Sequence, residues 1–157
     1  MPDLLTHTLF VTPLKSKFSK SFIFILLGTI LPDIFGRMLG IVFPNSGFIA
    51  WLQIGIHTPV SLILIAYIIS FFFEEKDRKT IFIYLIIGIY IHLLLDLFQK
   101  TTTFGYLWLF PFSFSYFNIP LIWPDETIFL IPLLILINLL IYLIIKKNKK
   151  IIPKKPN

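Results

Sequence analysis

The amino-acid sequence predicts an all-α integral membrane protein, a bundle of about five helices. Of its 157 residues, 57% are hydrophobic and only 14% are charged, whereas soluble domains are about 45–50% apolar and about 25% charged. The mean hydropathy is +0.88, and the apolar residues form runs of about 20, the length that crosses the hydrocarbon core as a helix. We therefore expect a single transmembrane domain over 1–145 and a basic cytoplasmic tail over 146–157.

Four apolar runs predict four spanning helices, over 21–43, 48–73, 80–99 and 127–145. The isoleucine-rich stretches do not alternate with polar residues, which favours helices over strands. A shorter run over 4–14 predicts one short N-terminal helix. Thr58-Pro59 is a pair that kinks a helix, while Gly28 and Gly88 favour close packing between helices.

Lys and Arg determine the expected orientation. If the helices alternate in direction and 15–20 is cytoplasmic, twelve of the fourteen basic residues lie inside, leaving only Arg37 and Lys100 outside. The C-terminus is then cytoplasmic. The segment 101–126 is an outer loop rich in aromatic residues, which favour the headgroup region. The basic tail suits an anionic membrane surface, so we expect membrane lipid and no nucleic acid as a partner.

All three histidines and two carboxylates fall in the outer half of the predicted helices, ~6–13 Å below the surface. These residues are His7, Asp33, His57, His92 and Asp96. Each also has a structural explanation: His92 and Asp96 form an i,i+4 pair, and so do Asp33 and Arg37. His57 could satisfy backbone groups freed by the kink, and His7 could lie at the interface.

Together the five residues favour a metal site, since ionisable groups buried in lipid are costly and mark function. The chain has no cysteine, so any metal must be held by imidazole and carboxylate. That ligand set suits one divalent ion, zinc foremost, with manganese or iron as alternatives.

Several motifs occur in a familiar order: Met1-Pro-Asp-Leu-Leu-Thr-His7, Leu31-Pro-Asp33, Gly55-Ile-His57-Thr-Pro, and His92-Leu-Leu-Leu-Asp96 followed by Leu109-Phe-Pro-Phe-Ser113. This set resembles the family of membrane-bound metal-dependent hydrolases (YdjM-like), especially its archaeal-type branch. The resemblance implies that His7, Asp33, His57, His92 and Asp96 are metal positions, with Asp3 as a further candidate. Many relatives carry a second acid where this chain has Phe35 and a histidine where it has Leu52, which implies one metal ion rather than two.

The favoured function is therefore a metal-dependent hydrolase that uses a metal-activated water near the outer interface. Its expected substrate is a small amphiphilic molecule such as a lipid phosphoester. Asp33 or Asp96 is the expected general base, and Arg37 the group that receives an anion. The alternatives are a small transporter or ion-binding membrane protein and a structural membrane scaffold.

Overall fold

The computed structural model describes residues 4–43, 46–100, 106–123 and 125–151, with the side chains of those ranges other than 36–38 and 149–151. Within these ranges the chain forms six α-helices, two 3₁₀ helices and no β-strand. The all-α fold class is thus confirmed for the described residues. In chain order the elements are α1 (Leu4–Val11), η1 (Thr12–Ser16), α2 (Phe22–Val42), α3 (Gly47–Ile56), α4 (Pro59–Ser70), α5 (Glu75–Leu97), η2 (Glu126–Phe129) and α6 (Leu130–Ile151).

Three helical stretches of the described chain are long and apolar enough to cross a membrane. They are α2 with 21 residues, α5 with 23, and the 23 residues Glu126–Asn148 that η2 and α6 form together. About 20 helical residues cover the hydrocarbon core. α1 has only eight residues and is the short N-terminal helix that the sequence predicts. α6 continues to Ile151, so the first residues of the basic tail extend this helix.

The predicted span over 48–73 is not one continuous helix, because α3 and α4 are bent by 77° where they meet. Thr58 is extended, with φ −119° and ψ 152°, since the ring of Pro59 disfavours a helical conformation at the residue before it. Pro59 also lacks the N–H that would reach the Gly55 carbonyl. The hydroxyls of Thr58 and Ser61 donate to that carbonyl instead, at 2.9 and 2.7 Å. The four continuous spans of the prediction are thus three helices and one broken pair.

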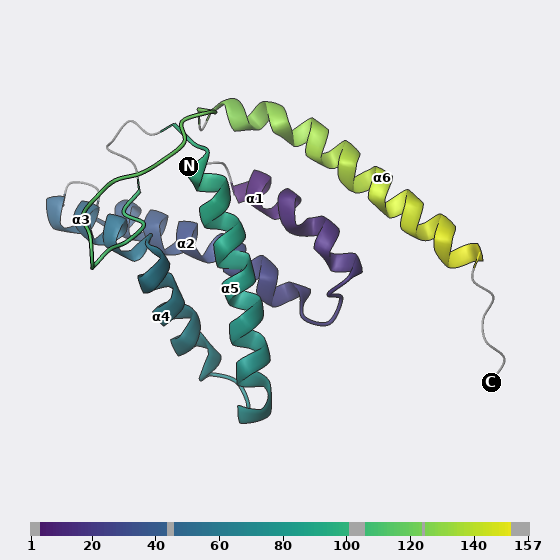
Figure 1. Ribbon diagram of the computed structural model, residues 1–157, viewed down its shortest axis with the longest axis horizontal. Coiled ribbons are helices and arrows are strands. Elements are labelled where there is room, and N and C mark those ends of the chain that lie inside the picture. The colour runs from purple at the N-terminus through teal and green to yellow at the C-terminus, as the bar shows by residue number, and fades with distance from the viewer. Residues whose placement is uncertain (1–3, 44–45, 101–105, 124, 152–157) are drawn as a thin grey trace.

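α5 is the central helix, and α2 and α4 pack against it (Figure 1). The α2–α5 contact is close enough to exclude side chains at two glycines, as the sequence predicts. A Cβ atom on Gly28 would collide with the carbonyl oxygen of Leu85, and one on Gly88 with that of Ile25. The apolar core beside this contact consists of Leu31, Leu62, Ala66, Ile81, Leu85, Ile89 and Leu93.

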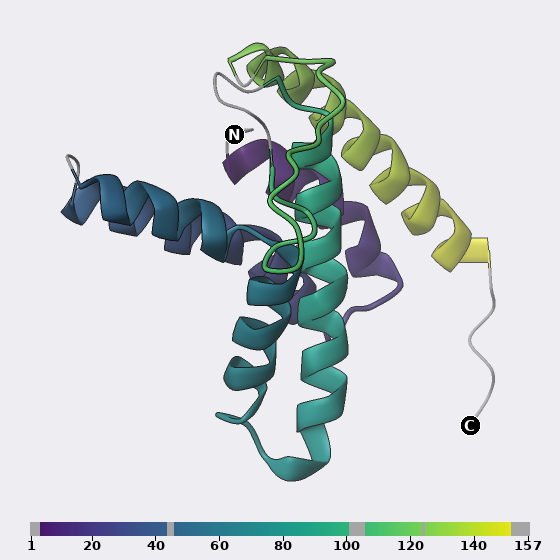
Figure 2. The same cartoon turned by 60° about the vertical axis from the view of Figure 1, so that its left-hand side comes forward.

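α6 packs on α1 and η1, away from the α4–α5 pair (Figure 2). The Asn138 side chain donates a hydrogen bond to the Leu9 carbonyl at 3.0 Å, which ties the two helices together. Many apolar side chains of α6 are exposed, among them Leu133 and Ile144. An apolar surface of this extent is unusual in a soluble monomer and suits contact with lipid.

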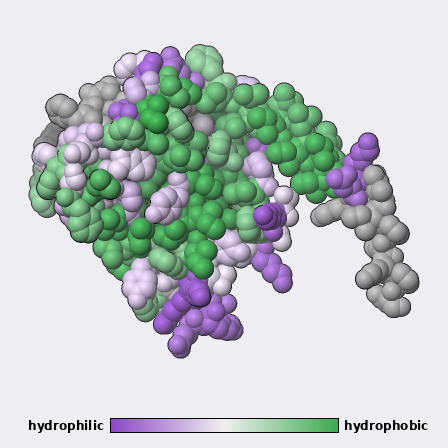
Figure 3. All heavy atoms as spheres, viewed as in Figure 1, coloured by the Kyte–Doolittle hydropathy of each residue, from purple (hydrophilic) through white to green (hydrophobic). Residues whose placement is uncertain are grey.

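Hydrophilic surface is confined to a few places on the face that Figure 3 shows. On the side of the molecule away from the N-terminus, hydrophilic atoms cover the α4–α5 turn, the α1–α2 turn and the C-terminal end of α6. Hydrophobic surface lies between these places and the opposite end of the molecule. This distribution is the one expected of a protein whose middle is surrounded by lipid.

The described part of the aromatic loop, 106–123, folds back over α5 and the α3–α4 break (Figures 1 and 2). Isolated bridges join Tyr106 to Phe117 and Gln99 to Ile122. The indole N–H of Trp108 donates to the Phe117 carbonyl at 2.8 Å. The loop is therefore held by its own hydrogen bonds above the region where the histidines lie.

Candidate metal centre

The five residues that the sequence singled out are all buried. The side chains of His7, Asp33, His92 and Asp96 have no exposed surface, and His57 is 6% exposed. They come from α1, α2, α5 and the break between α3 and α4. Burying ionisable groups is costly unless they interact with one another or with a ligand, so their surroundings require a physical explanation.

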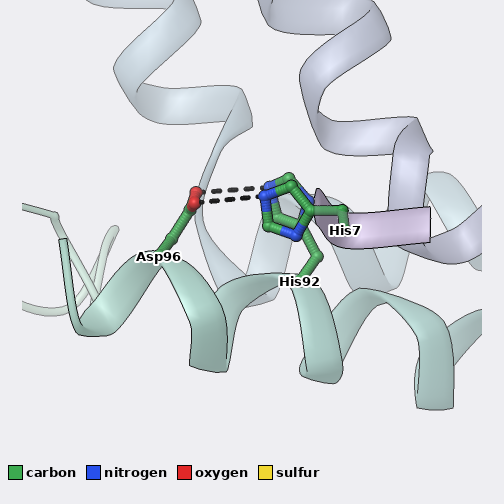
Figure 4. A group of neighbouring side chains, drawn as sticks. All are labelled: His7, His92 and Asp96. Atoms are coloured by element: carbon green, nitrogen blue, oxygen red, sulfur yellow. Dashed lines mark ion pairs between the residues drawn. The ribbon is translucent and has the colours of Figure 1, made fainter. Parts of the chain in front are cut away.

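Asp96 lies at the centre of the cluster. Its Oδ2 atom is 2.7 Å from Nε2 of His57 and 3.2 Å from Nε2 of His92, and its Oδ1 atom is 3.6 Å from Nε2 of His7. Figure 4 shows the rings of His7 and His92 facing the carboxylate. Imidazole nitrogens from three separate segments of the chain thus converge on one carboxyl group.

The spacing of these atoms fits a metal ion. One ligand atom from each of His7, His92 and Asp96 lies within 4.8 Å of the other two. Bonds of about 2.0–2.1 Å in a tetrahedral zinc site place ligand atoms about 3.3 Å apart, near the 3.2 and 3.6 Å observed. His7 Nε2 and Asp96 Oδ1 are buried without a hydrogen-bond partner, and a cation between them would satisfy both. The donor set therefore fits one divalent ion.

His57 joins this group through two of its members. Its Nε2 atom is 3.2 Å from Nε2 of His92 as well as 2.7 Å from the Asp96 carboxylate. An ionised carboxylate only accepts hydrogen bonds, so the His57–Asp96 hydrogen bond requires a proton on His57 Nε2. In the other neutral tautomer, with the proton on Nδ1, His57 Nε2 could serve as a fourth ligand.

A backbone carbonyl orients His92. The Nδ1–H of His92 donates to the carbonyl oxygen of Thr29 at 2.7 Å, which leaves the lone pair of Nε2 directed at the cluster. Metal-binding histidines commonly make such a hydrogen bond with their second nitrogen. The ring of His7 stacks on that of His92, with centroids 4.2 Å apart and planes inclined by 19°. The close contact of α2 with α5 is what brings Thr29 within reach.

Tyr106 covers the cluster from the aromatic loop. Its ring lies 5.7 Å from that of His57, stacked at 30°. Burial raises the pKa of the Tyr106 hydroxyl above its usual value, and the negative charges of Asp96 and Asp33 raise it further. Both carboxylates therefore act on one side chain, although they lie on different helices.

Asp33 is buried on α2, one helical turn after Thr29 and hence on the same face. Among the described residues, one group of side chains has the spacing to hold a metal ion, and it consists of His7, His92 and Asp96 without Asp33. The side chain of Arg37 and the whole of Asp3 lie outside the described residues, so their predicted roles stay predictions.

Two functional groups are absent from the sequence-based predictions of the site. A sequence gives no signal for the Thr29 carbonyl, since every residue has a backbone carbonyl. Only the place of Thr29, one helical turn before Asp33 on the same helix, could have indicated its role. Tyr106 was predicted only as one of many aromatic residues in the outer loop. Its position between the His92–Asp96 motif and the motif at Leu109 was the available signal.

Three apolar stretches of spanning length around a buried His–Asp cluster define a helical membrane protein with a candidate metal centre. The family comparison agrees: a model described as YdjM inner membrane protein matches residues 4–153. The chain therefore belongs to the YdjM inner membrane protein family. Comparisons with curated proteins and with solved structures found no match.

Proposed function

We propose that this protein is a membrane-embedded metal-dependent hydrolase that holds one divalent ion, zinc foremost, with manganese or iron as alternatives. The convergence of three imidazole nitrogens on the buried carboxylate of Asp96 is the observation that carries the proposal. A set of nitrogen and oxygen donors without thiolate is the one typical of catalytic zinc. We also propose that the protein belongs to the archaeal-type branch of the family.

His7, His92 and Asp96 would hold the ion, with His57 completing the set. When bound, a divalent ion there supplies Lewis-acid polarisation of a substrate oxygen and lowers the pKa of a water molecule. The negative charge of Asp96 offsets the cost of burying the cation in an apolar surrounding. The Thr29 carbonyl keeps Nε2 of His92 free to bind.

Asp33 is the candidate general base, because Asp96 is engaged by all three histidines. A carboxylate oxygen of Asp33 would accept the proton that water gives up during hydrolysis. Tyr106 stacks on His57 and would limit the entry of bulk water. Arg37, four residues after Asp33, would receive an anionic group of the substrate.

An amphiphilic substrate suits the position of the site. Asp96 is the second-last residue of α5, so the cluster lies near one end of that helix, beneath an aromatic loop. We infer that this end is the outer face and that the C-terminus is cytoplasmic, because the positively charged segments gather at the other end. In this arrangement the bent α3–α4 pair acts as the fourth span, and lipid is the expected partner.

A transport function is less well supported by the described residues. A proton or ion pathway needs polar groups across the whole membrane. The buried polar residues of α4 and α5 are His92 and Asp96 at one end and Ser70 at the other. Ser70 donates to the Tyr67 carbonyl of its own helix, so it offers no continuation of the cluster.

Metal content and turnover test the proposal together. Purified wild type should hold about one divalent ion per chain and hydrolyse a member of a panel of phosphoester and amide amphiphiles. His92→Ala and Asp96→Asn should lose both, whereas the control Ser70→Ala, a buried polar residue outside the cluster, should keep both. Equal metal content and activity in wild type and His92→Ala would refute a hydrolase that depends on this site.

A further inference from the structure

A pocket of about 280 Å³ lies beside the metal centre. Leu95 of α5, Phe98 directly after this helix, Leu121 and Ile122 of the outer loop, and Leu130 of α6 form its apolar walls. Thr6 also lines it and directly precedes the ligand His7, just as Leu95 precedes Asp96. Two of the chain segments that form the pocket therefore also carry candidate metal ligands.

Gln99 is the unusual member of this pocket. The residue is only 2% exposed, yet neither Oε1 nor Nε2 of its side chain has a hydrogen-bond partner. Its backbone, in contrast, is fully engaged: the N–H donates to the Asp96 carbonyl and the carbonyl accepts from Asn118, both at 3.0 Å. Leaving a buried amide unsatisfied is unfavourable, so a residue that lines the pocket holds, just behind the wall, an amide that lacks a partner.

The chemistry of the walls restricts what could satisfy this amide. Besides Gln99, the polar side chains of the lining are those of Thr6 and Thr127, and the other five lining residues are leucine, isoleucine and phenylalanine. A water molecule takes up about 30 Å³, so one bound beside these polar groups would fill only a small part of the pocket. A cation would need a carboxylate, and no acidic residue lines the pocket. An amide offers both a donor and an acceptor, which suits a ligand with a carbonyl oxygen next to a hydrocarbon chain. The volume of the pocket, about 280 Å³, is close to that of the smaller ligand pockets of proteins.

We propose that this pocket binds one acyl chain of a lipid, and that the side chain of Gln99 turns toward the pocket so that Nε2 donates a hydrogen bond to the ester carbonyl of the lipid. The chain fills the space between Leu95, Phe98 and Leu121, and its polar end lies toward the segments that carry His7 and Asp96. That the bound lipid is the substrate rests on the proposed function, whereas the binding itself does not. The substrate class is then an acyl lipid rather than a water-soluble ester or phosphate.

Photo-crosslinking in lipid nanodiscs tests this directly. Two probes are used, an ester-linked lysophosphatidylcholine and its ether-linked analogue, each with a diazirine in the chain. In the wild type, the ester probe should label peptides that contain 95–99 and 121–130 more strongly than the ether probe. Leu121→Trp, at a 60% exposed position where a larger side chain can enter the pocket, should weaken labelling by both probes about tenfold. The control Leu133→Trp, at a 53% exposed position on α6, should not.

Gln99→Leu provides the second test, with its own internal control. It should weaken labelling by the ester probe about fivefold, as expected for a lost hydrogen bond, and leave the ether probe unchanged. The proposal would be overturned if labelling were unchanged in Leu121→Trp, or if Gln99→Leu reduced labelling by both probes equally. Binding is measured without turnover, so a protein that fails the hydrolase test could still pass this one.

Discussion

The imidazole of His92 on α5 donates a hydrogen bond from Nδ1 to the backbone carbonyl of Thr29 on α2, over a distance of 2.7 Å. This contact depends on the two helices touching at Gly28 and Gly88, where a Cβ atom would meet opposing backbone. A side chain that could supply a metal ligand is therefore oriented by helix packing as well as by its own rotamer.

Gly88→Ala should weaken both the fold and the metal site. The added methyl group would push α2 from α5 at the Ile25 carbonyl, which costs about 1–3 kcal/mol of stability and lengthens the His92–Thr29 hydrogen bond. Loss of such a partner weakens metal affinity about 10–100-fold. Thermal unfolding in detergent and metal titration measure the two effects. Gly47→Ala is the matched control, because a Cβ there meets nothing within 4 Å.

The double variant Thr58→Val with Ser61→Ala should destabilise the break between α3 and α4. It removes both hydroxyls that donate to the Gly55 carbonyl, at a cost of about 1–3 kcal/mol for the unsatisfied acceptor. His57 lies at this break, so its contact with Asp96 should loosen and metal affinity should fall. Ser70→Ala, which removes a hydroxyl bonded within α4, should leave metal affinity unchanged. Unaltered affinity in the double variant would show that the break does not position His57.

Tyr106 should make stability depend on alkaline pH. Burial raises the pKa of its hydroxyl above the ordinary 10.0, so the folded protein keeps the proton at a pH where the unfolded chain releases it. Stability is then fully present below about pH 10 and falls as pH rises above it. Tyr106→Phe should reduce this fall, which thermal unfolding at pH 9 and pH 11 would measure. An identical fall in the variant would contradict the burial of this hydroxyl.

The inferred topology predicts where the C-terminus lies. A reporter fused after Asn157 should be active only when it functions in the cytoplasm, because the basic segments are retained on that side. Fusion after Glu74, in the α4–α5 turn, should report the same side, and fusion within the outer loop the opposite one. A C-terminal reporter active only outside the cytoplasm would require the inverted topology.

Much of the architecture follows from local properties of the chain. Apolar runs of spanning length identify α2, α5 and α6, since the bilayer sets a length that a sequence reveals directly. Spacing alone places His92 and Asp96 on one face of α5. The break at Pro59 was visible as a kink, but its 77° bend was not, because an angle between helices depends on what packs against each of them.

The sequence by itself determined the class of protein and the set of ionisable residues, because hydropathy and helical period are properties of short segments. Only the tertiary structure decided that Asp96 is the carboxylate on which His7, His57 and His92 converge, while Asp33 is buried on the face of α2 that carries Thr29. It likewise decided that the amide of Gln99 is buried in an apolar pocket. These relationships join residues far apart in the chain, and the packing of helices at contacts such as Gly28 with Leu85 sets the distances between them.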